Sequence, residues 1–501
     1  YIFVFPATYN ENITLKNNQK LIGASENWLC GTGSTIRSAS GSTIIQGSIT
    51  LAMNDTIKGI DFNNPGPIPF SSVLEERSAG GSIFIKDNGA SVGNLLVSNS
   101  AISNSSATQC GLVILNGGSL NVTFTSFNST GQSTSIQTNN CNGNLTLSSG
   151  MVNPSGSVTG DTLIKITGGN LSATFNNTFT QGNNSPVCFI GGGHTGTINF
   201  QSISAINGSG LQFDNADGTY NFNSTVTLNG GDAGVDILNG SSGIFTFLST
   251  TITNPTNAAF VVNSSNATIS QSGNISKNNG GRLIDIQSKS ANTVTIGGNL
   301  SATGSCTGIN VSNNTGGTIN FTSSTKTLNT PGINPVNLAS NSNIAINFTN
   351  GGLAITSGSA TGFNATGATT SVITVTGSNN TISSTSGTAL SVTNTTIGAS
   401  GLNFLSISSN GAVNGIVLNT TGTFGGLTIS GNGTNDFSGG TIQNSSNDGL
   451  LLTSTMNVSL SSMRILNSAH YGISGTGVTN FSFINGTIRN SGTGLTAQDS
   501  N

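Results

Sequence analysis

Charge is the scarcest property of this sequence: 6% of its 501 residues are charged, with 13 Lys and Arg against 16 Asp and Glu. So little positive charge excludes the electrostatic surface that binding to nucleic acid or to an anionic membrane requires. No apolar run reaches the roughly 18 residues of a membrane-spanning helix. We therefore expect no nucleic-acid partner and no insertion of this segment into a membrane.

Metal-ligating and redox-active side chains are also rare. The five cysteines, at positions 30, 110, 141, 188 and 306, are too scattered for a disulfide framework or a CxxC metal site. We therefore expect each cysteine to be buried and to pack as a small apolar side chain. His194 and His470 have no partner at ligand spacing and are expected at the surface or in turns. The run from Asp214 to Gly218 lacks the ligand spacing of a calcium loop. The sequence predicts no metal and no cofactor.

What the sequence does contain is glycine, 69 residues of it, and a repeat. Thr441-Ile-Gln-Asn-Ser, Arg464-Ile-Leu-Asn-Ser and Thr487-Ile-Arg-Asn-Ser recur 23 residues apart, and Gly449-Leu, Gly472-Ile and Gly494-Leu follow them at a nearly constant lag. A degenerate form of the same period runs upstream, for example in Thr197-Ile-Asn-Phe and Thr318-Ile-Asn-Phe. Such a period is typical of a solenoid.

Each repeat contains three short strands separated by turns rich in Asn and Gly. Between Thr219 and Gly243 these strands are Tyr220-Asn-Phe, Val226-Thr-Leu and Val235-Asp-Ile-Leu. The pattern predicts an all-β right-handed parallel β-helix, and about 24 residues per coil give roughly 20 coils. A leucine-rich repeat is disfavoured because no LxxLxL framework recurs, and a propeller because its blades need about 40 residues. Asn444, Asn467 and Asn490 fall at equivalent places and predict a structural asparagine ladder, although a turn preference of Asn explains them too.

We expect one continuous β-helix over 1–501, divided into N-terminal coils (1–62), an inserted Pro-rich loop (63–80), degenerate coils (81–440) and regular coils (441–501). Pro65, Pro67 and Pro69 crowd the inserted loop, where Glu75, Glu76 and Arg77 form the densest charge group of the chain. Long loops on rigid scaffolds often carry binding sites, so these three charged residues are predicted to bind a partner; a tolerated insertion is the alternative. The pattern continues to the last residue, and we expect a fragment of a longer protein.

Two stretches resemble known proteins. Pro6-Ala-Thr-Tyr-Asn-Glu, Lys20-Leu-Ile-Gly-Ala-Ser and Thr56-Ile-Lys-Gly-Ile-Asp-Phe resemble the opening coils of pectin-lyase-like right-handed β-helix proteins, with Ala7 in place of a common glycine. The repeats between 441 and 494 resemble those of bacterial surface proteins and autotransporter-type passengers. The resemblance implies a fold more than an activity. The clustered Asp, Arg, His or Lys residues of the enzymes in this superfamily have no match here, so no catalytic residue is carried over.

One pair of carboxylates supports an enzyme alternative. Asp236 and Asp285 align at the same outward position two coils apart, with Gln212 and Asn310 in the same ladder and Val261 between them. Two coil steps separate them by about 9.6 Å, near the upper limit for an inverting glycosidase. Solitary aspartates on a solvated strand face are common, so this pair supports only a secondary hypothesis of a polysaccharide-active enzyme.

These observations together favour a non-enzymatic extracellular structural or adhesive rod that displays a binding surface on the cell exterior. Expected partners are surface glycans or other host or cell-surface ligands, and abundant Asn-x-Ser/Thr sequons such as Asn121-Val-Thr could carry glycans. The alternative is a self-assembling filament or surface-layer subunit, because open β-helix ends pair with copies of the chain or with neighbouring segments of its parent protein.

Overall fold

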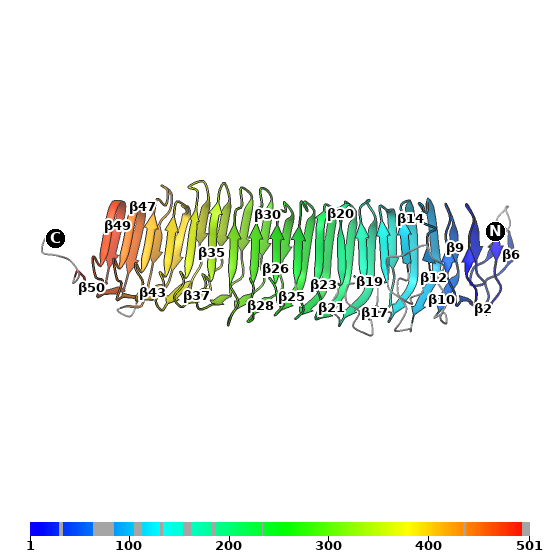
Figure 1. Cartoon of the computed structure of the whole chain (residues 1–501), viewed down its shortest axis with the longest axis horizontal. Coiled ribbons are helices and arrows are strands. Elements are labelled where there is room, and N and C mark those ends of the chain that lie inside the picture. Colours follow the sequence, from blue (N-terminus) through cyan, green and yellow to red (C-terminus); the bar gives the residue numbers. More distant parts are fainter. Residues whose placement is uncertain are drawn as a thin grey trace. The chain divides into compact units, whose positions relative to one another are not determined.

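The structure is a computed structural model that describes residues 1–29, 34–63, 85–104, 113–130, 134–153, 162–182, 186–232, 234–433 and 437–492. It contains two compact units, Tyr1–Thr251 and Ile252–Asn501, each of which is a stack of parallel strands (Figure 1). No helix occurs among the described residues, and hence none there could cross a membrane. The chain is therefore an all-β parallel β-helix, as the repeat predicts. Whether the units form one continuous helix stays a prediction.

The strands of unit 1 are β1 (Ile2–Phe3), β2 (Ala7–Tyr9), β3 (Ile13–Thr14), β4 (Lys20–Ile22), β5 (Trp28–Leu29), β6 (Thr35–Arg37), β7 (Thr43–Ile45), β8 (Ile49–Thr50), β9 (Thr56–Lys58), β10 (Ile60–Asn63), β11 (Ile85–Lys86), β12 (Asn94–Asn104), β13 (Val113–Asn116), β14 (Ser119–Ser129), β15 (Ile136–Asn139), β16 (Asn142–Leu147), β17 (Met151–Val152), β18 (Ile164–Thr167), β19 (Ser172–Gln181), β20 (Cys188–His194), β21 (Thr197–Ile206), β22 (Leu211–Ala216), β23 (Thr219–Asn229) and β24 (Val235–Leu238). The boundary between the units falls within β25 (Ile244–Thr253).

The strands of unit 2 are β26 (Phe260–Asn263), β27 (Thr268–Gln271), β28 (Ile275–Lys277), β29 (Ile284–Gln287), β30 (Thr293–Ile296), β31 (Leu300–Ala302), β32 (Ile309–Ser312), β33 (Thr318–Phe321), β34 (Lys326–Asn329), β35 (Val336–Asn341), β36 (Ala345–Phe348), β37 (Leu353–Ser357), β38 (Phe363–Gly367), β39 (Val372–Val375), β40 (Thr381–Ser384), β41 (Leu390–Thr393), β42 (Thr396–Phe404), β43 (Ser406–Asn410), β44 (Ile416–Asn419), β45 (Leu427–Ile429), β46 (Gly440–Gln443), β47 (Leu450–Ser461), β48 (Met463–Leu466), β49 (Ile473–Ile484) and β50 (Thr487–Arg489).

Three strands make one turn in much of unit 2, because each strand pairs in parallel with the strand three places later in the chain. Thus β29 pairs with β32, β30 with β33 and β31 with β34. In unit 1 two of the three predicted strands often merge: Tyr220 and Val226 both belong to β23, which bends where its pairing with β21 shifts register. Where two faces of the β-helix meet, the chain in unit 1 bends within a single strand, whereas in unit 2 a turn separates two strands.

Along one face the stacked strands, one per turn, are nine in unit 1 (from β1 to β23), β25 at the boundary and nine in unit 2 (from β27 to β49), slightly fewer than the roughly 20 coils predicted from a 24-residue repeat. Some turns are longer than the repeat. Neighbouring positions Asp61 and Ala101 are 40 residues apart, and Asn410 and Asn444 are 34 apart. Residues spent in such excursions add no turn, so a 24-residue period slightly overestimates the number of turns.

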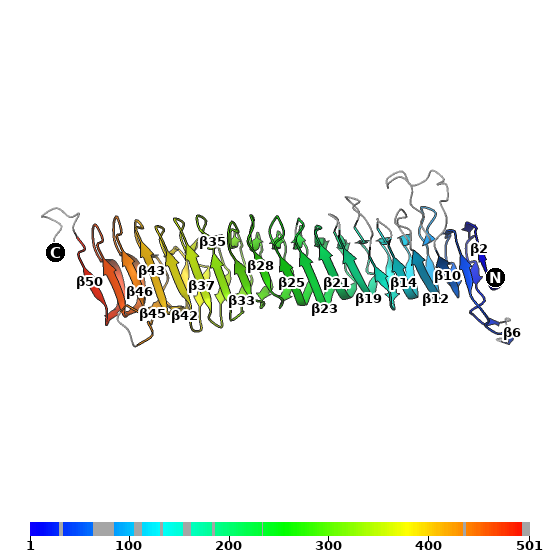
Figure 2. The same cartoon turned by 90° about the horizontal axis from the view of Figure 1, so that it is seen from below.

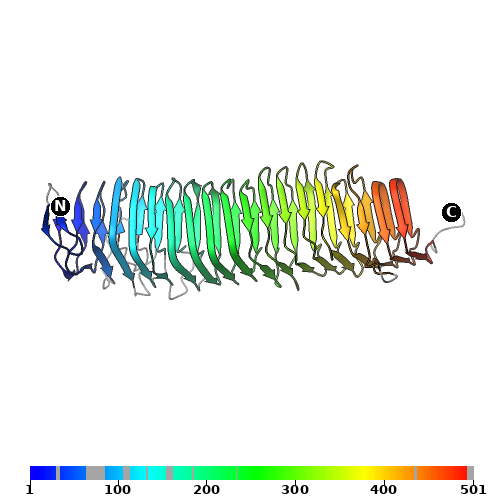
Figure 3. The ribbon, with the colours of Figure 1, turned by 180° about the vertical axis from the view of Figure 1, so that it is seen from behind.

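Inward side chains form continuous apolar ladders in each unit. In unit 1 the Phe222 ring stacks between Phe200 and Phe247, with ring centroids 4.9 Å apart on both sides. In unit 2 the rings of Phe321 and Phe348 stack with centroids 4.6 Å apart. All five rings are at most 1% exposed. Because alternate residues of a strand point to opposite faces, the same strands leave small polar residues outside. Figure 3 shows the strands of each unit from behind, lying side by side.

Candidate binding site

The first strands of unit 1 carry large apolar and basic side chains on their outer face. In one outward row, Lys20 of β4 lies beside Thr56 of β9, which lies beside Leu96 of β12. In the next row, Phe3 of β1 lies beside Ile22, and Ile22 beside Lys58. Because the strands are parallel and in register, the rows run across the sheet and form a fixed surface.

Tyr1 extends the first row and is held by Lys20. The Lys20 ammonium donates a hydrogen bond of 3.1 Å to the Tyr1 hydroxyl and lies 4.9 Å from the centroid of its ring. The Tyr1 ring also stacks with Phe3 at 5.9 Å between centroids. With 76% of its surface exposed, Tyr1 offers an aromatic face to solvent that its neighbours hold in place.

An antiparallel hairpin of β5 and β6 stands beside this face; Figure 2 shows β6 projecting from the stacked strands of unit 1. Trp28 anchors the hairpin, since its ring lies 4.7 Å from Phe3 and 5.3 Å from Phe5, centroid to centroid. The Arg37 guanidinium lies 4.9 Å from the centroids of both Phe5 and Trp28. The hairpin is therefore fixed to the first turns by aromatic and cation–π contacts.

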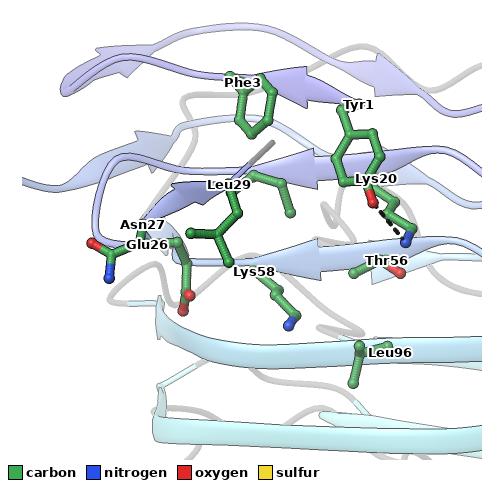
Figure 4. Close-up of a pocket in the computed structure, with 10 residues that line it drawn as sticks. Tyr1, Phe3, Lys20, Glu26, Asn27, Leu29, Thr56, Lys58 and Leu96 are labelled. Carbon is green, nitrogen blue, oxygen red and sulfur yellow. Dashed lines mark hydrogen bonds between the residues drawn. The ribbon is translucent and has the colours of Figure 1, made fainter. Parts of the chain in front are cut away.

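Between the hairpin and the strand face lies a hollow of about 560 Å³ (Figure 4). It is lined by Tyr1, Phe3, Lys20, Ile22, Glu26, Asn27, Leu29, Thr56, Lys58 and Leu96. We call this hollow the aromatic groove. Its two lysines and one glutamate give it a formal charge of +1 (2 − 1), whereas the whole chain has −3. Glu26 also accepts a hydrogen bond from the Asn99 amide.

Concave surfaces that combine apolar faces with a few polar groups bind small ligands. The aromatic groove offers donors at Lys20 and Lys58, an acceptor at Glu26 and both functions at Asn27. Its lining has a single carboxylate and neither His nor Cys. The arrangement is thus suited to non-covalent binding more than to acid–base chemistry, which pairs two titratable groups.

The aromatic groove is not predicted from the sequence. A signal was present, because Tyr1, Phe3, Phe5, Tyr9 and the only tryptophan of the chain, Trp28, all fall within the first 28 residues. The predicted binding residues Glu75, Glu76 and Arg77, and the loop 63–80 apart from Asn63, lie outside the described residues. Their role stays a prediction.

Asn444, Asn467 and Asn490 directly follow β46, β48 and β50 and have positive φ angles of 57°, 55° and 53°. The Asn467 amide donates to the Asn444 side-chain oxygen at 3.0 Å, and Asn444 donates in the same way to Asn410 at 2.8 Å. Asparagine adopts positive φ more readily than most residues, and its amide both donates and accepts, so it serves the turn and the stack together.

The two aspartates of the enzyme hypothesis, Asp236 and Asp285, belong to different units. In unit 1 Asp236 lies beside Gln212, which donates a hydrogen bond of 2.9 Å to its carboxylate; burial outweighs this bond and raises the pKa of Asp236 to about 6. In unit 2 Asp285 lies between Val261 and Asn310 and accepts a hydrogen bond of 2.8 Å from Asn310.

The prediction that His194 lies at the surface or in a turn is wrong, because its side chain is fully buried. Its Nε2 donates to the Leu171 carbonyl at 2.8 Å and its Nδ1 lies 3.0 Å from the Tyr220 hydroxyl, so the stack satisfies both ring nitrogens. His470 is exposed. Cys141, Cys188 and Cys306 are buried and free, while Cys30 and Cys110 lie outside the described residues. No group of three His, Cys, Asp or Glu that could hold a metal occurs in the described part of the chain.

Comparison with known proteins adds no relative. No protein-family model, no curated protein and no solved structure matches this chain. The parallel β-helix is therefore established from the chain's own structure, and any function has to be argued from its own surface.

Proposed function

We propose that this chain is an adhesive segment of an extracellular or cell-surface protein, and that it binds saccharides in the aromatic groove. The single observation that supports the proposal is the groove itself, in which exposed aromatic faces, two lysines, a glutamate and an amide meet on a rigid strand face. The resemblance of the repeats to bacterial surface proteins agrees with an external location.

A saccharide fits this combination of groups better than a purely apolar ligand. A sugar ring has an apolar face that can stack on an aromatic ring such as Tyr1, and hydroxyls at its edge that donate to Glu26 and accept from Lys58. The exposed, open lining disfavours a ligand that needs full enclosure. Tyr1 and Lys20 already contact each other, so little side-chain entropy is lost when a ligand is bound there.

The fluorescence of Trp28 provides the test, because it is the only tryptophan and its ring packs on the groove residue Phe3. Titration with a panel of neutral and charged oligosaccharides should change the emission for at least one of them. Lys58→Gln should weaken that binding about tenfold, a loss of roughly 1.4 kcal/mol. The matched control is Lys165→Gln, on β18 of the same unit and outside the groove lining, which should bind as the wild type does.

Two results would contradict the proposal: no emission change with any saccharide of the panel, or equal loss of binding in Lys58→Gln and Lys165→Gln. Location is tested separately by labelling intact cells of the source with an antibody against the chain. Exclusively internal labelling would remove the external location and leave the binding test intact. Release of shortened sugars during the titration would favour the polysaccharide-active alternative.

A further inference from the structure

Lys277, the last residue of β28 in unit 2, buries its ammonium group without an acidic partner among the described residues. The side chain is 2% exposed, and its hydrogen bonds go to the carbonyls of Pro255 and Thr256 and to the side-chain oxygen of Asn279, the last at 2.6 Å. All three acceptors are neutral. Burying a charge without a counter-ion is costly, and burial accordingly lowers the pKa of Lys277.

The charge of one titratable group affects the pKa of Lys277: the buried thiol of Cys306 raises it. Lys277 and Arg282 in turn lower the pKa of this thiol, although burial raises it more. Within the described residues, no carboxylate shifts the pKa of Lys277 or of Cys306. A negative charge beside the ammonium would therefore stabilise this part of unit 2.

Asn279, which contacts the ammonium, is followed by Gly280. The hydrogen bond from Lys277 withdraws electrons from the Asn279 amide carbonyl and would stabilise negative charge that develops on its oxygen. Gly280 has no side chain to shield its backbone nitrogen, and the space where a Cβ would lie is open to at least 4 Å. The amide carbon thus has a polarising cation on one side and an unhindered backbone nitrogen next in the chain.

We propose that Asn279 is a site of spontaneous deamidation that supplies Lys277 with its missing counter-ion. The Gly280 backbone nitrogen attacks Cγ of Asn279 and forms a C–N bond. The bond between Cγ and Nδ2 breaks, and Nδ2 leaves as ammonia with the proton from the Gly280 nitrogen. Water then opens the resulting succinimide ring and leaves a carboxylate, on an aspartate or isoaspartate residue, beside the ammonium.

The chain provides internal controls in the same unit. Asn410 and Asn414 are also followed by glycine, but their side-chain oxygens accept from neutral donors: Asn410 from the Asn444 amide at 2.8 Å, and Asn414 from the Asn447 amide at 3.0 Å. If the following glycine alone sets the rate, all three asparagines deamidate alike. If the lysine contributes, Asn279 is faster.

The experiment is peptide mapping by mass spectrometry of the full chain during incubation at neutral pH, which measures every site in one sample. Asn279 should deamidate at least roughly tenfold faster than Asn410 and Asn414, which is a tenth of the roughly 100-fold effect that one oxyanion donor provides at its lower limit. Lys277→Met should remove this advantage and leave the control sites unchanged. Equal rates at the three sites, an unchanged rate in Lys277→Met, or a cross-link between Lys277 and Asn279 would overturn the proposal.

A second variant keeps the test decisive if Lys277→Met does not fold. Asn279→Asp places the carboxylate directly and should unfold at a higher temperature than freshly prepared wild type, because pairing the buried ammonium outweighs the loss of the hydrogen bond of 3.2 Å from Asn279 Nδ2 to the Asn254 carbonyl. Asn278→Asp is its control, since Asn278 is exposed and its substitution should leave the melting temperature unchanged. A melting temperature of Asn279→Asp at or below that of wild type would contradict the counter-ion role.

Discussion

Two fully buried lysines of unit 2 differ in how well their ammonium groups are hydrogen-bonded. Lys289 donates to one carbonyl, that of Ala267 at 3.0 Å. Lys326 donates to three, those of Ser323, Thr349 and Gly351. Burial lowers the pKa of each to about 8. Burying the charge thus costs a similar free energy at the two lysines, whereas Lys289 hydrogen-bonds one carbonyl and Lys326 hydrogen-bonds three.

Lys289→Met should therefore increase the free energy of unfolding at pH 7 by about 1 to 2 kcal/mol, because it removes a buried charge and leaves one carbonyl without its donor. Lys326→Met should decrease it by about 1 to 3 kcal/mol, because three carbonyls lose theirs. Urea unfolding of both variants checks the contrast. Stabilisation by both substitutions, or by neither, would show that hydrogen bonding does not separate the two sites.

The pH dependence of wild-type stability follows from the same lysines. In the folded state they release their protons near pH 8, and in the unfolded state near the ordinary value of 10.5. Between these values the unfolded chain binds more protons, so the contribution of each lysine to the free energy of unfolding rises with pH. Lys289→Met should lack its share of this rise, measured as a smaller difference between unfolding at pH 8 and pH 10. An identical slope in the two proteins would contradict the assignment.

The asparagine ladder depends on both the φ angle and the amide of its members. Asn467→Ala should destabilise unit 2 by about 1 to 2 kcal/mol, since alanine loses the hydrogen bond to Asn444 and is strained at a φ of 55°. Asn467→Gly should cost less, because glycine adopts positive φ without strain. Chemical unfolding measures both. If glycine proved as costly as alanine, backbone strain would have no part in the preference for Asn.

Among elements, the β5–β6 hairpin differs from the parallel strands in being attached mainly through Trp28 and Arg37. Arg37→Ala removes the cation that lies on both Phe5 and Trp28 and should free the hairpin without unfolding the turns beneath it. The expected result is a red-shifted Trp28 emission and weaker saccharide binding at an unchanged melting temperature. Arg37→Lys should restore part of the emission. A fall in melting temperature equal to that of a core substitution would contradict this local role.

Whether a structural element can be predicted from the sequence depends on whether it is repeated along the chain. Most strands of unit 2 and the turn asparagines recur at a nearly regular spacing, so the pattern that predicts one predicts most of the others; the 34-residue step from Asn410 to Asn444 is an exception. Among the strands that the structure describes, the antiparallel pairing of Trp28 with Arg37 occurs once. The aromatic groove needs this hairpin and the rows of β1, β4 and β9 together. Its residues lie up to 95 positions apart, from Tyr1 to Leu96, and only the fold shows that they meet.

At the scale of the whole molecule, each turn contacts chiefly the turns before and after it, so damage to one turn should remain local. The stack of Phe200, Phe222 and Phe247 tests this in unit 1. Phe222→Ala leaves a cavity between two rings and should cost about 3 to 5 kcal/mol. The ladders of unit 2, such as Phe321 on Phe348, contain none of these rings.

Hydrogen exchange measured by mass spectrometry gives the extent of the damage. In Phe222→Ala, exchange should accelerate in β21, β23 and β25, which carry the three rings, while amides of β33 and β36 keep their protection. Phe348→Ala should give the reverse pattern. Uniform acceleration along the chain in either variant would mean that the turns unfold as one cooperative body, and that their stability cannot be treated as a sum over neighbouring pairs.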